Sequence, residues 1–344
     1  MKEISIPHQN ILNWAVDVFT KIGLTANDAE IISNALVKTS LWGTDSHGIA
    51  RITHYLGRFE NGTIHTKPQF KFIKTAAATG QLDGDHGHGI IVMNKACEYA
   101  VQLAKEAGTG VIGITNSSHC GAIGLFTRQI TESGMIGFAF THADSLVVPH
   151  GGNKPFFGTN PISISFPTEK KEEPVCLDMA TSIVPWNYIM NAKRESKEVP
   201  SGLGVDKDGK DTTHSKDIIA VKPMAEHKGY ALAFLIDLLC GPLNGMNFGP
   251  NMTSMYNDPD KKRELGSLII AIDPDKFGGK ENVMRAASNM INQIRNHGDD
   301  VLFPGEPEYL NKEKRIKSGI PVSQLMLEDF NKWSAKLGVV ALSV

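Results

Sequence analysis

The 344-residue sequence lacks long apolar runs, a signal peptide and a strong excess of either charge. Its longest apolar run, at residues 230–240, contains Asp237 and falls well short of the roughly 20 residues that span a bilayer. The first ten residues have neither the basic start nor the apolar stretch of a secretory signal. The formal net charge of -2 gives no broad positive field for a phosphate backbone. These absences predict a cytoplasmic protein that binds neither membranes nor nucleic acid.

Cysteine is scarce, and the common signature motifs are missing. The four cysteines are far apart and form no C-x-x-C pair, which favours reduced side chains that act as small apolar residues. Neither the phosphate-loop motif G-x-x-x-x-G-K-[ST] nor the zinc motif H-E-x-x-H occurs. The sequence therefore predicts neither a disulfide framework nor a phosphate-loop nucleotidase.

The middle of the chain alternates helical patterns with short β-branched runs, which is typical of an α/β fold. Helices are expected at residues 96–107, 126–133 and 229–239, and strands at 111–115, 136–141, 162–166, 175–179 and 268–272. The first third and the tail after Phe277 read as helical, with a capping box at Thr25 and Asp28. We expect a helical lobe from residues 1–75 plus 285–344, carrying the substrate side and dimer contacts, and an α/β cofactor-binding lobe from residues 76–284.

A glycine motif at residues 108–113 matches G-x-G-x-x-G letter by letter. It follows a predicted helix and leads into the strand at 111–115, whereas the dinucleotide fingerprint follows a strand and opens a helix. The motif is therefore interpreted as a helix stop.

A stripe of polar side chains begins at Ser46. If Ser46 caps a helix, then His47, Arg51 and Tyr55 recur every four residues on one face. An arginine grips a carboxylate with two hydrogen bonds, and a neighbouring histidine can pass a proton. The alternative is that these polar residues form an ordinary helix face that is exposed to solvent.

Residues 116–122 lie between a predicted strand and a predicted helix, where α/β sheets build their sites. His119 in this loop is a candidate general base, and a hydrogen-bonded structural histidine is the alternative. Asp178 ends a later strand and would hold ribose hydroxyls, while Lys228 opens a helix and would meet a phosphate.

Together these segments resemble the type 2 malate/L-lactate dehydrogenases over residues 10–310. The matching segments occur in the order of the family, at residues 45–48 with Arg51, 118–122, 148–152, 158–161, 178–181 and 228–230. The resemblance implies a fold other than a Rossmann domain. It implies a mixed, largely antiparallel sheet flanked by helices, with a second helical lobe that joins both chain ends, usually in a homodimer.

The same resemblance assigns roles to individual residues. His119 or His47 would be the acid/base, with the choice left open, and Arg51, Ser46 and Tyr55 would bind the substrate. The cofactor, NAD with NADP as the alternative, would contact Asp178, Met179, Ala180, Lys228, His119, Gly121, Ala143, Pro304, Gly305 and Glu306.

The expected reaction is hydride transfer between the nicotinamide and a small 2-hydroxy or 2-oxo carboxylic acid. Malate and ureidoglycolate are the leading substrates, with lactate and sulfolactate as further candidates. Because a neutral histidine must accept the hydroxyl proton, the oxidation rate is expected to rise with pH between roughly 6 and 8. The alternative is a metal-dependent hydrolase that uses histidine and cysteine loops, with candidate ligands His86, His88, His119, Cys120, His142 and His150.

Overall fold

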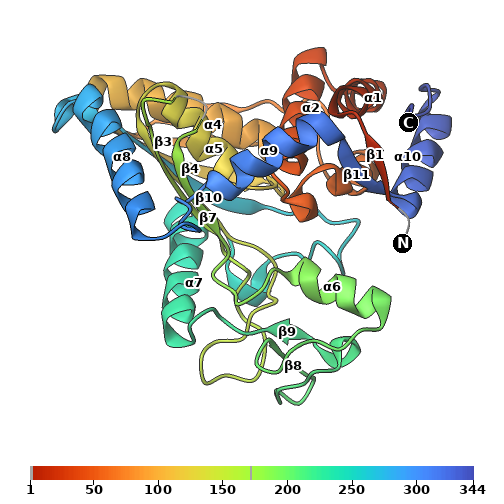
Figure 1. The fold of residues 1–344 in the computed structure, drawn as a ribbon. Helices are drawn as coiled ribbons and strands as arrows, with labels where there is room; N and C mark the ends of the chain where they lie inside the picture. Colours follow the sequence, from red (N-terminus) through yellow and green to blue (C-terminus); the bar gives the residue numbers. More distant parts are fainter. Residues whose placement is uncertain (1–2, 171–172) are drawn as a thin grey trace.

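The computed structural model describes residues 3–170 and 173–344, and its centre is a mixed seven-stranded sheet (Figure 1). The strand order is β2-β3-β4-β10-β5-β6-β7, and only β3 and β4 pair in parallel. These strands are β2 Lys71–Lys74, β3 Thr79–Asp83, β4 Thr109–Ser117, β5 Ile136–Thr141, β6 Ile162–Phe166, β7 Val175–Met179 and β10 Leu265–Ile272. The expected non-Rossmann, largely antiparallel fold is confirmed.

The described residues form ten α-helices around this sheet and in the parts of the molecule beside it. They are α1 His8–Lys21, α2 Ala26–Leu41, α3 Ile52–Glu60, α4 Gly89–Ala107, α5 Gly124–Glu132, α6 Trp186–Glu195, α7 His227–Cys240, α8 Lys280–Ile294, α9 Glu306–Ser318 and α10 Gln324–Leu337. The helix stop predicted at residue 108 is confirmed, because Gly108 caps α4 in the left-handed conformation with φ of 84°.

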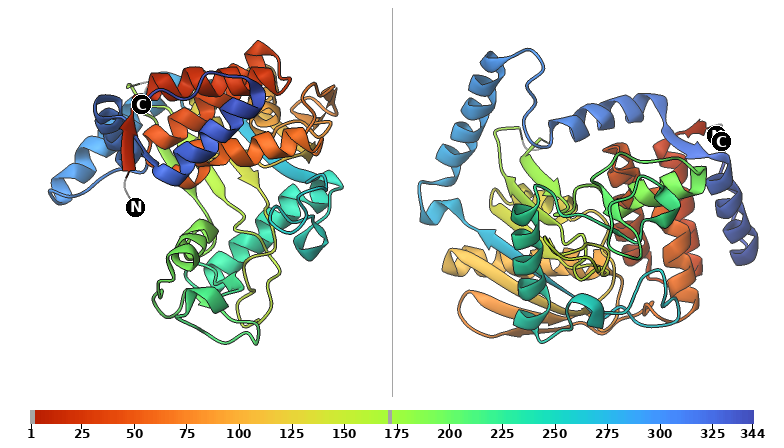
Figure 2. Two further views of the ribbon diagram at one scale, coloured as in Figure 1. Left: turned by 90° about the vertical axis from the view of Figure 1, so that its right-hand side faces the viewer. Right: turned by 90° about the horizontal axis from the view of Figure 1, so that it is seen from below.

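The two ends of the chain meet in the helical lobe, as the resemblance implied (Figure 2). Strand β1 (Glu3–Ile6) pairs antiparallel with β11 (Ile320–Ser323). Beside this pair, Trp14 of α1 donates a hydrogen bond of 2.8 Å to Ser334 of α10. The sequence did not predict these short strands. The proposed division of the chain at residues 75 and 284 stays a prediction.

The two faces of the sheet are covered unequally. Helices α4 and α5 cover one face closely, where small residues allow a tight approach. A Cβ added to Gly137 would lie 2.9 Å from the carbonyl oxygen of Thr127 in α5. The opposite face carries the half-exposed apolar side chains Phe138, Phe140, Ile162 and Ile164, which we call the open sheet face.

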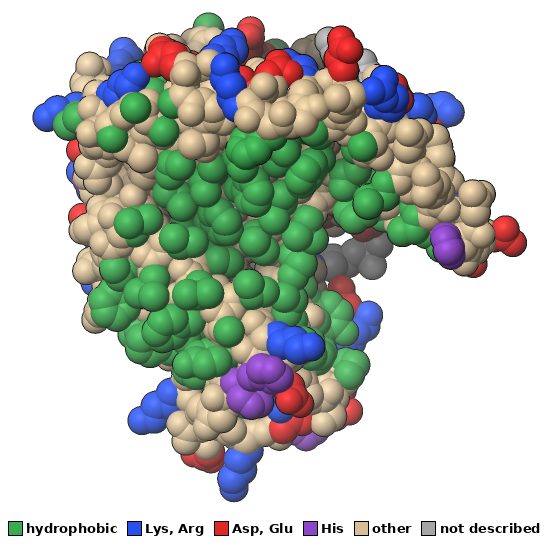
Figure 3. Space-filling view, turned by 90° about the vertical axis from the view of Figure 1, so that its left-hand side faces the viewer, with side chains coloured by type: hydrophobic (Ala, Val, Ile, Leu, Met, Phe, Trp, Pro, Cys, Tyr) green, Lys and Arg blue, Asp and Glu red, His purple; other side chains and the backbone are tan. Residues whose placement is uncertain are grey.

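Helix α7 lies against this opposite side of the sheet and remains apolar where it meets solvent. Its exposed residues include Phe234, Leu235 and Leu238. Figure 3 shows hydrophobic side chains gathered over the middle of the side that carries α7 and α8, with charged side chains mostly near its rim.

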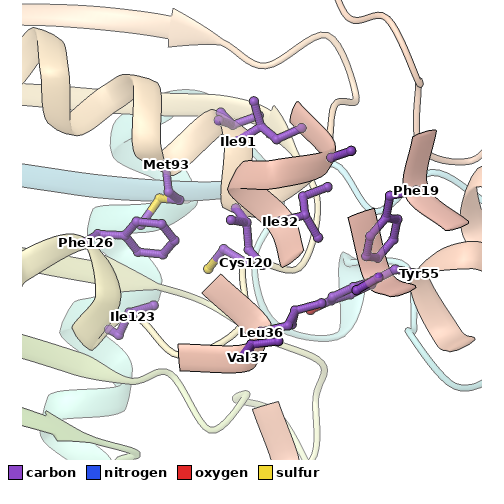
Figure 4. Close-up of a cluster of buried hydrophobic side chains, with 14 of the residues drawn as sticks. Phe19, Ile32, Leu36, Val37, Tyr55, Ile91, Met93, Cys120, Ile123 and Phe126 are labelled. Atoms are coloured by element: carbon purple, nitrogen blue, oxygen red, sulfur yellow. The ribbon is translucent and has the colours of Figure 1, made fainter. Parts of the chain in front are cut away.

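The N-terminal helices enclose the main core and hold the segment that carries the predicted stripe. Thr25 caps α2 by accepting a hydrogen bond from the Asp28 amide, as predicted. Figure 4 shows Tyr55 in the same buried cluster as Phe19 and Leu36. The expected helix cap at Ser46 is wrong, because residues 45–51 form two 3-10 turns and α3 begins only at Ile52.

A smaller lobe lies beyond the edge of the sheet and contains α6 with the two-stranded sheet of β8 (Gly204–Val205) and β9 (Ala220–Val221). It has a hydrophobic cluster of its own, built from Val147, Phe157, Ile189, Val199, Ile218, Val221 and Ala233. The described residues include no helix long and apolar enough to cross a membrane.

Candidate active site

A cavity of about 220 Å³ opens where β4, β5 and β7 reach their carboxyl ends. Antiparallel pairing brings the amino end of β10 to the same edge, so loops from distant parts of the sequence converge there. Of the predicted site residues, those that line the cavity are Ser46, His47, Arg51, His119, Gly121, Ala143, Asp178, Met179 and Ala180.

The two candidate acid/base histidines face each other in this cavity. His47 comes from the 3-10 turn Asp45–His47, and His119 comes from the loop after β4. Their ring centroids are 5.6 Å apart and their planes are inclined by 24°. A ligand held between the loops therefore meets both imidazoles.

Two hydrogen bonds at Nδ1 fix the orientation of the His119 ring. The Tyr55 hydroxyl lies 2.6 Å from this nitrogen, and the Gly121 amide donates to it at 3.3 Å. Because a backbone amide always donates, Nδ1 accepts, and the proton of the neutral ring lies on Nε2. Tyr55 is fully buried and is not among the residues that line the cavity.

Both histidines are neutral near neutral pH. Burial, followed by the positive charge of Arg51, lowers the pKa of His47 to about 3. The same two causes, in the same order, lower the pKa of His119 well below its ordinary value. Neutral imidazole is the form that can accept a proton.

Arg51 is fixed by the backbone of its own segment. Its Nε donates to the Ser46 carbonyl at 2.7 Å, and Asn187 of α6 donates to the same oxygen at 3.2 Å. This bond orients the guanidinium along the cavity wall, where an anionic ligand can meet its outer nitrogens. The Ser46 hydroxyl lies 2.8 Å from Nδ1 of His47.

The opposite wall is formed by the end of β7. Asp178 accepts a hydrogen bond of 2.8 Å from the amide of Gly124, the first residue of α5. Burial raises the pKa of Asp178 to about 6, although this bond and nearby Arg128 act in the opposite direction. Met179 and Ala180 continue the same wall.

Four predicted cofactor contacts lie outside the cavity. Lys228 is exposed at the beginning of α7. Pro304, Gly305 and Glu306 lead into α9, and the Pro304 carbonyl accepts a hydrogen bond from the Cys176 amide. The side chain of Glu306 pairs with Arg295 and does not face the cavity. These residues were predicted from a resemblance in sequence, which does not determine the direction in which a side chain points.

Several lining residues were not predicted, among them Trp42, Arg128, Asp144, Asn187, Tyr256, Arg263 and Glu308. Arg263 and Asp144 form a buried ion pair. Asp144 follows the end of β5, so the strand-end rule that indicated His119 and Asp178 would also have indicated it. No comparable signal exists for Arg263, which lies far away in the sequence.

Arg58 of α3 organises the segment that contributes Tyr256. Its guanidinium is buried and donates to the carbonyl oxygens of Met255, Asp258, Pro259 and Lys261 at 2.8 to 3.1 Å. One side chain thereby fixes the loop that contributes Met255 and Tyr256 to the lining of the cavity.

The hydrolase alternative is not supported. Within residues 3–170 and 173–344, no three His, Cys, Asp or Glu side chains are grouped so that they could hold a metal ion. The alternative depended on such a group, and the comparisons with known proteins favour a different class.

The chain is similar to known dehydrogenases over nearly its whole length. It is 34% identical over 326 residues to the malate/(S)-sulfolactate dehydrogenase of Methanothermus fervidus, covering 94% of this chain and 95% of that one. It is 32% identical to the NAD(+) ureidoglycolate dehydrogenase of Escherichia coli, covering 87% of each chain.

Solved structures agree with these sequence relatives. The sulfolactate dehydrogenase of Methanocaldococcus jannaschii superimposes with a TM-score of 0.90 at 34% identity, over 98% of both chains. The malate dehydrogenase of Entamoeba histolytica gives a TM-score of 0.92 at 26% identity, over 98% of this chain and 99% of that one. The family model for malate/L-lactate dehydrogenase matches residues 6–331, and the chain therefore belongs to the malate/L-lactate dehydrogenase family.

Proposed function

We propose that this enzyme transfers a hydride between C2 of a small 2-hydroxy carboxylic acid and NAD. The observation that carries the proposal is the meeting of two neutral histidines and Arg51 in one cavity, opposite the β7 wall. A carboxylate on Arg51 would lie beside the imidazoles, which would place the neighbouring C2 oxygen within their reach.

His119 is the first candidate for the proton at the C2 oxygen. In the tautomer present here, its Nε2–H would donate a hydrogen bond to the oxygen of a bound 2-oxo acid. Reduction would transfer the Nε2 proton from the doubly protonated ring, which then returns to the neutral form with its remaining proton on Nδ1. Oxidation of a hydroxyl requires a free Nε2, with the proton on Nδ1 and the Tyr55 oxygen as its acceptor. Because a tyrosine hydroxyl can donate or accept, Tyr55 would support both directions. His47 remains the second candidate.

The residues of the cavity fit a nicotinamide dinucleotide. The Asp178 carboxylate offers an acceptor to ribose hydroxyls, and the Gly121 and Ala143 backbones leave room for close approach. Once bound, the nicotinamide supplies the hydride acceptor or donor. NAD is preferred over NADP in this proposal, because an ionised Asp178 near the ribose would repel an additional phosphate.

A polar group on C2, in place of the methyl group that lactate carries there, is the expected mark of the substrate. Beyond the histidines the wall carries Asn187, Tyr256 and the Arg263–Asp144 pair, and polar groups left facing a methyl group would lose hydration without replacement. Malate, ureidoglycolate and sulfolactate each carry such a polar group and are therefore proposed ahead of lactate, with malate and ureidoglycolate as the leading candidates.

A homodimer is part of the proposal. The open sheet face and the exposed apolar residues of α7 form a broad hydrophobic surface on one side of the molecule (Figure 3). A patch of this kind marks an interface. A second copy of the chain is the proposed occupant, and a cytoplasmic location also stays a prediction.

The decisive experiment measures nicotinamide absorbance with malate, ureidoglycolate, sulfolactate and lactate, each with NAD and with NADP. We expect NAD-dependent turnover, and a higher kcat/KM for an acid that carries a polar group on C2 in place of a methyl group than for lactate. Turnover of lactate at equal or higher kcat/KM would overturn the substrate assignment. Absence of turnover with every acid would overturn the proposed reaction.

A further inference from the structure

Arg128 of α5 is a buried cation without a close carboxylate partner. Its side chain is 5% exposed, and its Nη2 has no hydrogen-bond partner among the described residues. The guanidinium carbon lies 4.1 Å from the ring centroid of Trp42, and Nε donates to the Tyr309 hydroxyl at 3.3 Å. The Glu308 carboxylate is 4.0 Å from Nη2.

Other buried arginines have closer partners. Arg58 donates to four carbonyl oxygens, and Arg263 pairs with Asp144, although its Nε lacks a hydrogen-bond partner among the described residues. Burying a guanidinium with an unused N–H group is costly, because the group loses water and gains nothing in exchange. The environment of Arg128 is therefore incomplete without a further acceptor.

A second cavity, of about 240 Å³, opens beside Arg128 and offers the space for one. Its walls contain Lys38, Trp42, Arg128, Glu132, Pro174, Tyr309 and Lys312. Three of these side chains are cations and one is an acid. Trp42 and Arg128 also line the active-site cavity, so the two cavities share a wall.

The cations are close enough to affect one another. Burial lowers the pKa of Lys38, Glu132 opposes this effect, and Lys312 and Arg128 lower the pKa further. An anion among these three side chains would remove their mutual repulsion and give Arg128 the acceptor that it lacks.

We propose that this second cavity is a phosphate-binding site, in which Arg128 Nη2 and the ammonium groups of Lys38 and Lys312 hold one phosphate group. Two sources share this chemistry: a phosphate of the bound dinucleotide, or a free phosphate ion. The site goes beyond the proposed reaction and does not depend on which acid is oxidised.

The test replaces Lys312, which is half-buried on α9, with glutamine and uses Lys314→Gln as the control. Lys314 lies on the same helix but is exposed and outside the cavity, so both variants lose one charge. Arg128 itself is left intact because its loss would disturb the core. Calorimetry measures the binding of inorganic phosphate, NADH and NADPH to each protein. We expect Lys312→Gln to weaken phosphate binding about tenfold or more, and Lys314→Gln to leave it unchanged.

Competition identifies the source. Phosphate that competes with NADH, together with weaker NADH binding in Lys312→Gln, identifies a phosphate of the dinucleotide. If Lys312→Gln weakens the binding of NADPH alone, the site holds the additional phosphate of NADPH. If inorganic phosphate and NADH bind at the same time, the site holds a free phosphate ion. The comparison is made for each ligand in turn. If the wild type, Lys312→Gln and Lys38→Gln/Lys312→Gln bind that ligand with the same affinity, for all three ligands, the proposed site is overturned. Phosphate binding is read without turnover, so its failure is distinct from failure of the proposed reaction.

Discussion

Tyr55 links the hydrophobic core to the active-site cavity through a single hydroxyl group. Its ring is fully buried, while its oxygen lies 2.6 Å from Nδ1 of His119. Tyr55→Phe keeps the ring and removes only this partner. We expect kcat to fall about tenfold, since the lost hydrogen bond is worth about 1 to 1.5 kcal/mol.

The Tyr55→Phe variant should bind NADH as the wild type does and melt within a few degrees of it. Fluorescence titration and thermal unfolding check both points. An unchanged kcat in both directions would remove Tyr55 from any role in positioning His119.

The lowered histidine pKa values change the expected pH dependence. The ordinary histidine pKa predicted a rise in oxidation rate between pH 6 and 8. With the pKa of His47 at about 3 and that of His119 well below 6.5, both rings are already neutral at pH 6. We therefore expect kcat/KM for the acid, at saturating NAD, to be flat from pH 6 to 8 and to fall only at lower pH. A rise between pH 6 and 8 that disappears in His119→Ala would contradict this expectation.

Asp178 combines a proposed role in cofactor binding with a cost in stability. Its pKa is raised from 3.8 to about 6, so folding favours the protonated carboxyl. That contribution is fully present below pH 4 and is lost as pH rises through 6. Asp178→Asn retains an oxygen for the Gly124 amide. We expect it to raise the unfolding free energy at pH 8 by on the order of 1 kcal/mol, or about 2 °C in Tm, while weakening NADH binding.

The gain in Tm of Asp178→Asn should be constant above about pH 6.5 and should shrink toward pH 4. Calorimetric scans at pH 8 and pH 5 measure it. A lower Tm for the variant at pH 8 would show that the charged carboxylate is stabilising.

At the scale of elements, the loop after η5 (Gly249–Asn251) depends on α3 for its shape. Arg58→Lys replaces a planar group that donates to four carbonyl oxygens with one ammonium that reaches fewer. We expect amide exchange in residues 252–263 to become about ten- to a hundredfold faster, because at least one charged hydrogen bond is lost. KM for the acid should rise as Tyr256 loses its fixed position.

Arg285→Lys on α8 is the matched control for this variant, since Arg285 is exposed and distant from the loop. Exchange by mass spectrometry compares both variants with the wild type. Equal exchange rates in all three would show that the loop is held by other contacts.

Elements with a strong local pattern could be predicted from the sequence, and those defined by distant partners could not. Strands at 136–141, 162–166 and 175–179 have the expected bounds, because alternating large apolar residues mark them directly. Strands β1 and β11 have four residues each and become strands only through pairing across the chain. Residue propensity is too weak over four positions to reveal them.

The same distinction applies to the cavity. His119 follows β4 and Asp178 lies at the carboxyl end of β7, and this position indicates a site from the sequence alone. The bond between Tyr55 and His119 could not be predicted, because it depends on how α3 packs beside the loop after β4. Lys228 is the opposite case: the sequence motif predicted a cofactor contact, but the side chain is exposed to solvent.

At the scale of the whole molecule, the hydrophobic surface around α7 predicts the oligomeric state. Leu235 is 56% exposed, and glutamate at this position would place a charge in the proposed interface. We expect sedimentation to give a dimer for the wild type and a monomer for Leu235→Glu. Val340→Glu is the control, because Val340 is 85% exposed in the C-terminal segment, away from α7. A monomeric wild type, or a dimeric Leu235→Glu variant, would contradict the proposed interface.

The pairing of β1 with β11 has a consequence for synthesis on the ribosome. Residues 3–6 find their partner only in residues 320–323, and Trp14 stacks near Phe330 with ring centroids 4.5 Å apart. Domains begin to fold while the chain is still being made, from the N-terminus onward. Here α1 emerges before β11 and α10, and part of its apolar surface stays uncovered until they have been translated. Chaperones and proteases that act on nascent chains therefore meet this surface before its partner exists.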